Sequence, residues 1–108
     1  MTKNRIFAID MTHFDSADMV GTFLPINSLG LDEACFIIRI TNDTSADVIV
    51  SFDGVTDNDY VRYGETLQLY AVPSDDRTNF AKGLVVYLRG AANQGYIYLS
   101  GYYKLPGL

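Results

Sequence analysis

The amino-acid sequence predicts an all-β protein, a single antiparallel β-sandwich of jelly-roll-like type with about seven or eight strands. Apolar and polar residues alternate with period two along most of the chain, and no segment has a helical period. Turn-forming residues interrupt this alternation roughly every dozen residues, as is typical of sandwiches and barrels. With 108 residues, 48% hydrophobic and 19% charged, the chain is expected to form one globular domain over residues 1–108.

The expected strands are the alternating or apolar runs that turn residues bound. They are residues 5–10, 18–26, 35–41, 47–52, 59–64, 66–72, 84–90 and 95–104. Residues 35–41, CFIIRIT, form the most apolar run. We therefore expect this run to be a central strand, with Phe36, Ile38 and Ile40 buried on one face.

The segments between the strands predict how they connect. Residues 42–46, NDTSA, are expected to form a hairpin turn, because Asn and Asp hydrogen-bond their own backbone and tolerate turn conformations. Residues 91–94, AANQ, are expected to join the last two strands as a second hairpin, and residues 73–83 are the longest polar loop. Pro25 favours an edge strand or a bulge for its segment, since proline cannot donate a ladder hydrogen bond.

The stretch 48–61, VIVSFDGVTDNDYV, places three carboxylates between two apolar runs. Asp53, Asp57 and Asp59 with Gly54 raise the possibility of a calcium site, because Ca²⁺ takes six to eight oxygen ligands from such loops. The stretch lacks a closing bidentate acid, and Asp-Gly is among the strongest hairpin signals. We expect a strand, a tight turn and a strand, with no metal bound.

The catalytic candidates are few. His13, the single histidine, lies in THFDS, which is expected to be a polar loop, and no acid or nucleophile is recognisable as its partner. Cys35, the single cysteine, opens the most apolar strand and is expected to pack in the core as an inert thiol. One cysteine makes no internal disulfide, and one histidine with one cysteine is too few for a zinc site. The protein is expected not to be an enzyme and to need no cofactor.

Charge and hydropathy restrict the partners. The net charge is −5 with eight Lys and Arg, so the chain repels phosphate backbones and is not expected to bind nucleic acid directly. No apolar run approaches the roughly 20 residues of a membrane span, and the N-terminal residues do not resemble a signal peptide. We expect folding in a reducing cytoplasm and no membrane contact.

The last strand, GYIYLSGYY, is apolar or amphipathic on both faces. Its alternation places Tyr96, Tyr98 and Tyr102 on one face. The opposite face receives Ile97, Leu99 and Tyr103. Tyrosine rows can stack on sugar rings, but tyrosine is also enriched at protein interfaces, and the absence of tryptophan favours protein contact. The residues expected in protein contacts are Tyr96, Tyr98, Tyr102, Tyr103, Leu105 and Leu108.

Three segments together resemble a known group of proteins. They are ITNDTSADVIVSFDG, then DNDYVRYGETLQLY, then the pair VVYLRG and YIYLSGYY. From about residue 14 to residue 103, the chain resembles small all-β proteins encoded among the virion genes of tailed bacteriophages. The shared patterns are of fold rather than of chemistry, so no catalytic residue is implied.

The resemblance implies a structural virion protein without fixing its role. Among these roles we favour a capsid decoration (cement) subunit that stabilises the particle through protein contacts. Its partners would be copies of itself and other virion proteins, and it would be located in the virion. A neck or tail component is a second possibility that the resemblance leaves open. A glycan- or receptor-binding module, using the tyrosines and the acidic loop, is a third.

Overall fold

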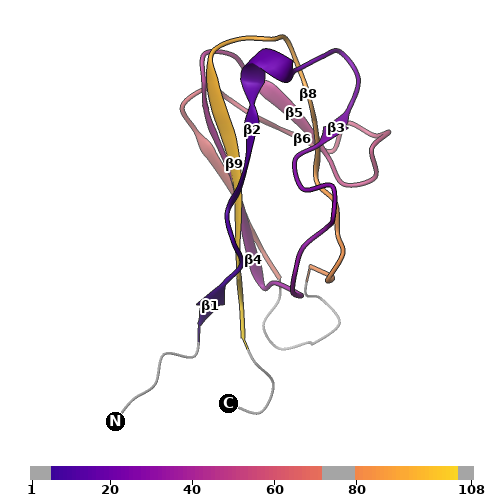
Figure 1. The fold of residues 1–108 in the computed structure, drawn as a ribbon, viewed down its shortest axis with the longest axis vertical. Coiled ribbons are helices and arrows are strands. Elements are labelled where there is room, and N and C mark those ends of the chain that lie inside the picture. The colour runs from indigo at the N-terminus through magenta and orange to yellow at the C-terminus, as the bar shows by residue number, and fades with distance from the viewer. Residues whose placement is uncertain (1–5, 72–79, 105–108) are drawn as a thin grey trace.

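The computed structural model describes residues 6–71 and 80–104, which form two antiparallel sheets packed face to face (Figure 1). Sheet A has five strands and sheet B has four, so the described residues contain nine strands where seven or eight were expected. Sheet A contains β1 (Phe7–Ala8), β2 (Thr12–Asp15), β4 (Ile37–Thr44), β7 (Thr66–Tyr70) and β9 (Gly95–Tyr103). Sheet B contains β3 (Leu24–Pro25), β5 (Val48–Ser51), β6 (Asp59–Val61) and β8 (Tyr87–Arg89).

The strand order is that of a jelly roll. Sheet A runs β1-β9-β4-β7, with β2 also paired to β9, and sheet B runs β3-β8-β5-β6. The pairs β2·β9, β3·β8, β4·β7 and β5·β6 are nested, as if one long hairpin had been rolled up so that alternate pairs fall in opposite sheets. The predicted all-β, antiparallel, jelly-roll-like sandwich is therefore confirmed.

Both predicted hairpins that flank the longest strands are wrong. β4 and β5 lie in different sheets, and so do β8 and β9. Residues 42–44 extend β4, and residues 45–47 and 90–94 cross between the sheets. β4 already pairs with β7 on one side and β9 on the other, which leaves no free edge for β5. Buried Asn42 holds the first crossing: its side-chain amide donates to the carbonyls of Ala46 at 3.0 Å and Val61 at 2.9 Å.

The hairpin predicted over residues 48–61 is confirmed as β5·β6, with Val48 opposite Val61. Its connection is the loop 52–58 rather than a tight turn. Within that loop Gly54 has φ +81°, a conformation that favours glycine.

The N-terminal strand predictions needed correction. The strand expected at residues 5–10 is reduced to the short β1, and THFDS, expected to be a loop, contributes β2. β9 is nine residues long, so β1 and β2 can pair in succession along the same side of it. Residues 18–26 contribute only β3, which is the edge strand expected from Pro25 and follows a short 3-10 turn (Ser16–Asp18).

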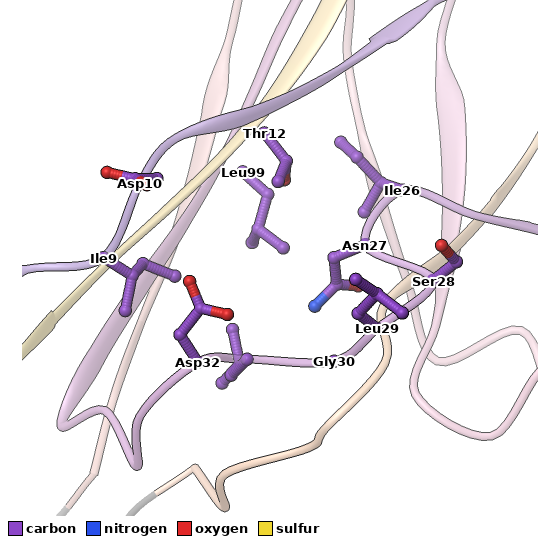
Figure 2. A pocket seen from close by; sticks show the side chains of 11 residues that line it. Ile9, Asp10, Thr12, Ile26, Asn27, Ser28, Leu29, Gly30, Asp32 and Leu99 are labelled. Atoms are coloured by element: carbon purple, nitrogen blue, oxygen red, sulfur yellow. The ribbon is translucent and has the colours of Figure 1, made fainter.

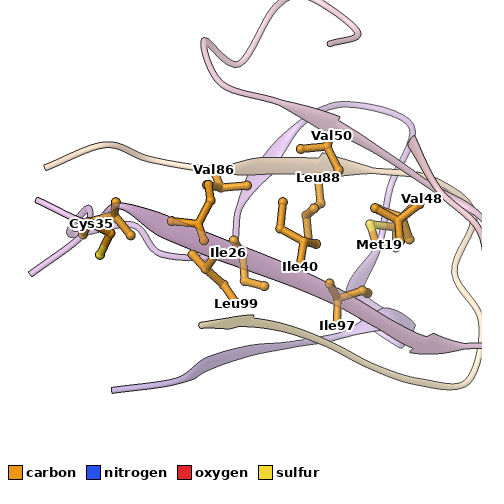
Figure 3. Close-up of a cluster of buried hydrophobic side chains, with 13 residues drawn as sticks. Met19, Ile26, Cys35, Ile40, Val48, Val50, Val86, Leu88, Ile97 and Leu99 are labelled. Carbon is orange, nitrogen blue, oxygen red and sulfur yellow. The ribbon is translucent and has the colours of Figure 1, made fainter. Parts of the chain in front are cut away.

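The core fills the space between the sheets (Figure 3). Ile38 and Ile40 are fully buried, as predicted, while Phe36 precedes β4 and is half-buried, with Lys104 Nζ 5.2 Å from its ring centre. The buried apolar side chains come from both sheets and the connecting loops: Met19, Ile26, Leu31, Cys35, Ile38, Ile40, Val48, Val50, Val61, Ala71, Val86, Leu88, Ile97 and Leu99. Burying a side chain of this size contributes about 1.5–3 kcal/mol, so this layer dominates stability.

Candidate interaction surface

The outer side of sheet A is built by the alternation of its strands. On β9, Ile97 and Leu99 are fully buried, so Tyr96, Tyr98 and Tyr102, which share the other face as predicted, project outward. Residues directly opposite on neighbouring strands share a face. We call the resulting set the tyrosine face: Ala8, His13, Asp15, Ile37, Arg39, Thr41, Asp43, Thr66, Gln68, Tyr70, Tyr96, Tyr98, Ser100 and Tyr102.

Aromatic rings form a continuous group at one end of this face. The rings of His13 and Tyr96 meet edge to face with centres 5.7 Å apart, and Tyr96 lies 6.3 Å from Tyr98. Tyr96 keeps 42% of its surface exposed and Tyr70, on β7, keeps 67%. Exposed tyrosines grouped on one face in this way are typical of surfaces that contact a partner.

Arg39 lies in the middle of the tyrosine face. β4 places it opposite Ser100 of β9 on one side and Gln68 of β7 on the other. It borders a shallow hollow of about 480 Å³, which is lined by Ala8, Ile9, Met11, Arg39, Thr41, Tyr98, Ser100 and Tyr102.

The guanidinium of Arg39 is incompletely satisfied. Its Nε is buried, and among residues 6–71 and 80–104 it has no hydrogen-bond partner; Arg39 also makes no ion pair with any of them. A buried donor left without a hydrogen bond costs about 1–3 kcal/mol. We therefore expect replacement of Arg39 by an apolar residue to stabilise the isolated chain. The sequence analysis missed Arg39, although it is the one charged residue in the most apolar run.

Tyr103 does not belong to the tyrosine face. It has the parity of the inward residues, is half-buried, and stacks on Phe7 of β1 with ring centres 5.7 Å apart and an interplanar angle of 27°. Tyr103 therefore contributes a contact within the chain. Leu105 and Leu108, the other two predicted contact residues, lie outside the described residues.

The outer side of sheet B carries an arginine that is fully engaged. Arg89 of β8 forms a two-pronged contact with Asp57, at 2.7 Å through Nη2 and 3.2 Å through Nε. Its guanidinium also lies 5.4 Å from the ring centre of Phe23. The hydrogen bond to Asp57 raises the pKa of Arg89.

The three carboxylates between residues 53 and 59 are bound by three different partners. Asp53 accepts hydrogen bonds from the backbone of Val55 and Thr56 and from the Thr56 and Ser51 hydroxyls, and these bonds lower its pKa. Asp57 pairs with Arg89, and Asp59 accepts from the Tyr60 amide at 2.8 Å. In the described part of the chain, no group of three or more His, Cys, Asp or Glu could hold a metal ion. Absence of bound calcium stays a prediction.

The two candidate catalytic residues lie apart. Cys35 is fully buried beside Gly101, where an added Cβ would come within 2.9 Å of its Sγ. Burial, followed by the nearby Glu33 and Asp32, raises the pKa of the Cys35 thiol to about 11, which suppresses the reactive thiolate. His13 lies on β2 against Tyr96, on the other side of β9 from β4.

A second hollow opens between the sheets where β1 leads into β2 (Figure 2). It measures about 220 Å³, and Leu99 and Ile26 form apolar walls. The Thr12 hydroxyl is buried there without a hydrogen-bond partner in the described structure, and Asp10 and Asp32 also border it.

Comparisons with known proteins identify no family for this chain. No family model and no curated protein matches the chain. A chain from a solved structure described as Bacillus endospore appendages that "form a novel family of disulfide-linked pili" matches with a TM-score of 0.49 and 16% sequence identity. That likeness covers 96% of this chain and 92% of the other. Within residues 6–71 and 80–104, no helix is long and apolar enough to cross a membrane.

Proposed function

We propose that this protein is a structural subunit of a tailed-bacteriophage virion, a capsid decoration protein that stabilises the particle through protein–protein contacts. The tyrosine face is the observation that carries the contact function, because it surrounds the unpaired Arg39 with partly exposed tyrosines. Tyr and Arg are enriched among the residues that dominate binding energy at interfaces. The virion assignment rests on the resemblance of residues 14–103 to small virion proteins.

The fold is compatible with this proposal without requiring it. Jelly rolls occur in viral capsid proteins and also in lectins, so function must come from the surface rather than from the topology. We propose a non-catalytic role because Cys35 is buried with a raised pKa and His13 contacts a tyrosine ring. Because the single cysteine is buried, the proposed assembly is non-covalent.

A glycan- or receptor-binding module is the second candidate. Arg39 borders a hollow with Tyr98, Tyr102 and Ser100, a set that offers an aromatic wall, a hydroxyl and a cation to a sugar bearing a carboxylate. The hollow is shallow, whereas small-molecule sites are usually concave. Protein contact is therefore the better explanation of the same residues.

The proposal is tested by rebinding purified protein to phage particles that lack it. The double variant Tyr98→Ala/Tyr102→Ala should lose most particle association, because it removes the rings that flank Arg39 on the tyrosine face. Its melting temperature should fall by some degrees because both side chains are half-buried, but the variant should stay folded, since both project away from the core. Electron microscopy of decorated particles then separates a head location from a neck or tail location.

The matched control is Tyr60→Ala/Tyr63→Ala. These tyrosines are 55% and 63% exposed and lie outside sheet A. The control should bind particles like the wild type. Equal binding by wild type, test variant and control would overturn the contact function of the tyrosine face, and acidic-glycan binding abolished by the test variant would support the second candidate instead.

A further inference from the structure

The tyrosine face carries charges of both signs at matched positions on a single strand. Arg39 and Asp43 both project outward from β4, each two residues from Thr41, which projects in the same direction. At the usual strand rise, Arg39 and Asp43 are about 13 Å apart. Asp43 is exposed, and neither residue has an ion-pair partner within 6–71 and 80–104.

We propose that the tyrosine face binds the tyrosine face of a second copy of this chain, related by a two-fold axis that crosses β4 at Thr41. Such an axis lies between the facing sheets and reverses the strand direction. It therefore sets Arg39 of each copy opposite Asp43 of the other, so that one strand supplies both halves of two equivalent ion pairs. Two-fold interfaces require this kind of self-complementary surface. The inference rests on the proposed contact function and names its partner.

The unpaired guanidinium explains why the dimer gains from this arrangement. Arg39 is half-buried and has no ion-pair partner in the described residues, and a carboxylate from the facing copy can accept from its two Nη groups. Two-pronged pairs are the strong members of their class, and Arg89 forms such a pair with Asp57 on sheet B. The second copy would supply the carboxylate that Arg39 lacks on sheet A, just as Asp57 supplies one to Arg89 on sheet B.

Charge favours this face over the others for contact between copies. The chain has a net charge of −5, so two copies repel each other over most of their surface. The tyrosine face balances Arg39 against only two carboxylates, Asp15 and Asp43, and is otherwise aromatic, aliphatic or neutral.

The area of the face is also sufficient. β9 spans nine residues, about 30 Å, and four neighbouring strands are about 19 Å wide at the usual spacing. That is roughly 570 Å² before the relief of the side chains, on the order of the 800 Å² a side of standard interfaces.

Charge exchange tests the inference on the full chain by sedimentation equilibrium, with melting temperatures as the check on folding. The wild type should dimerise. Arg39→Asp and Asp43→Arg should each weaken dimerisation by about 100-fold or more, because each places like charges opposite one another twice per dimer. The combined variant Arg39→Asp/Asp43→Arg restores opposite charges and should dimerise within about tenfold of the wild type. Arg62→Asp makes the same charge change on an exposed residue outside sheet A and should have no effect.

Three results would overturn the inference: a monomeric wild type at millimolar concentration, single variants that dimerise like the wild type, or a folded double variant that stays monomeric. A monomeric wild type whose particle binding is lost in Tyr98→Ala/Tyr102→Ala would retain the proposed function and remove only the second copy as the partner. Binding of a free uronic acid to the monomer, abolished by Arg39→Asp, would overturn the inference in favour of the glycan-binding candidate.

Discussion

Arg39 and Arg89 lie on opposite outer sides of the same sandwich, and their surroundings differ in one respect. Arg89 is held by both oxygens of Asp57 and by the ring of Phe23, so its charge is satisfied within the chain. Arg39 is flanked by tyrosines, and its buried Nε has no partner among the described residues. The arginine on the outer side of sheet B is thus paired within the described chain, whereas the arginine on the outer side of sheet A is not. We expect Arg39 to gain its ion pair when the proposed partner binds.

The largest expected change in stability concerns the hydrophobic core between the two sheets. Ile38→Ala should lower the free energy of unfolding by about 2–5 kcal/mol, because Ile38 is fully buried and its truncation leaves a cavity. Ile37→Ala is the matched control on the same strand: Ile37 is half-buried on the tyrosine face, and its loss should cost about 1 kcal/mol. Urea unfolding measures both. Equal losses would show that the inner and outer sides of β4 are wrongly assigned.

The two arginines should respond to the same substitution with opposite signs. Arg39→Leu should raise the free energy of unfolding of the monomer by about 1 kcal/mol, because it removes an unpaired buried donor and keeps an apolar stem. Arg89→Leu should lower the melting temperature, since it leaves Asp57 without its ion-pair partner. The loss at Arg89 should shrink in about 1 M salt, where the screening length is roughly 3 Å.

Thermal unfolding at low and high salt, at concentrations where the protein is monomeric, measures this pair of changes. A destabilising Arg39→Leu would show that Arg39 is satisfied in the isolated chain. The difference between the two sides of the sandwich would then disappear.

Local sequence pattern predicted the sandwich but not its strand pairing. Period-two alternation correctly placed Ile38 and Ile40 inside, and it correctly put Ile97 and Leu99 together on one face of their strand. The turn residues at 42–46 looked like a hairpin because turn chemistry is local. The crossing is instead held by Asn42, which bonds to Val61, a residue 19 positions away that the local pattern does not reach.

The candidate surface was predicted only in part, for a similar reason. Alternation correctly placed Tyr96, Tyr98 and Tyr102 on one face of their strand. It placed Tyr103 on the opposite face but could not show that its ring would stack on Phe7, because that contact joins the two ends of the chain. A lone charge in an apolar strand was visible at Arg39, but whether it has a partner depends on residues from three strands.

The carboxylate of Asp53, in the loop between two strands of sheet B, offers a smaller test through the pH dependence of stability. Its four hydrogen bonds lower its pKa in the folded protein below the unfolded value of about 3.9. A depressed folded pKa means that the carboxylate stabilises the fold above about pH 4 and that this contribution is lost as the pH falls below it. The melting temperature of Asp53→Ala should therefore lie below that of the wild type at pH 6, and the gap should close toward pH 2. Val55→Ala, in the same loop and 83% exposed, should show no such closing gap.

The smallest expected effect is that of calcium on the same loop. Asp53, Asp57 and Asp59 are each engaged with a different protein group, namely Thr56 and its neighbours, Arg89 and the Tyr60 amide. A calcium ion would need several of these oxygens to converge within about 2.6 Å of one point, which would break the Arg89 pair and the hydrogen bonds to Asp53. Excess EDTA should therefore leave the melting temperature unchanged, and millimolar calcium should not raise it. A drop of several degrees with EDTA, reversed by calcium, would mean that the loop rearranges around an ion. The outer side of sheet B would then bind a metal ion, whereas that of sheet A is proposed to bind a protein.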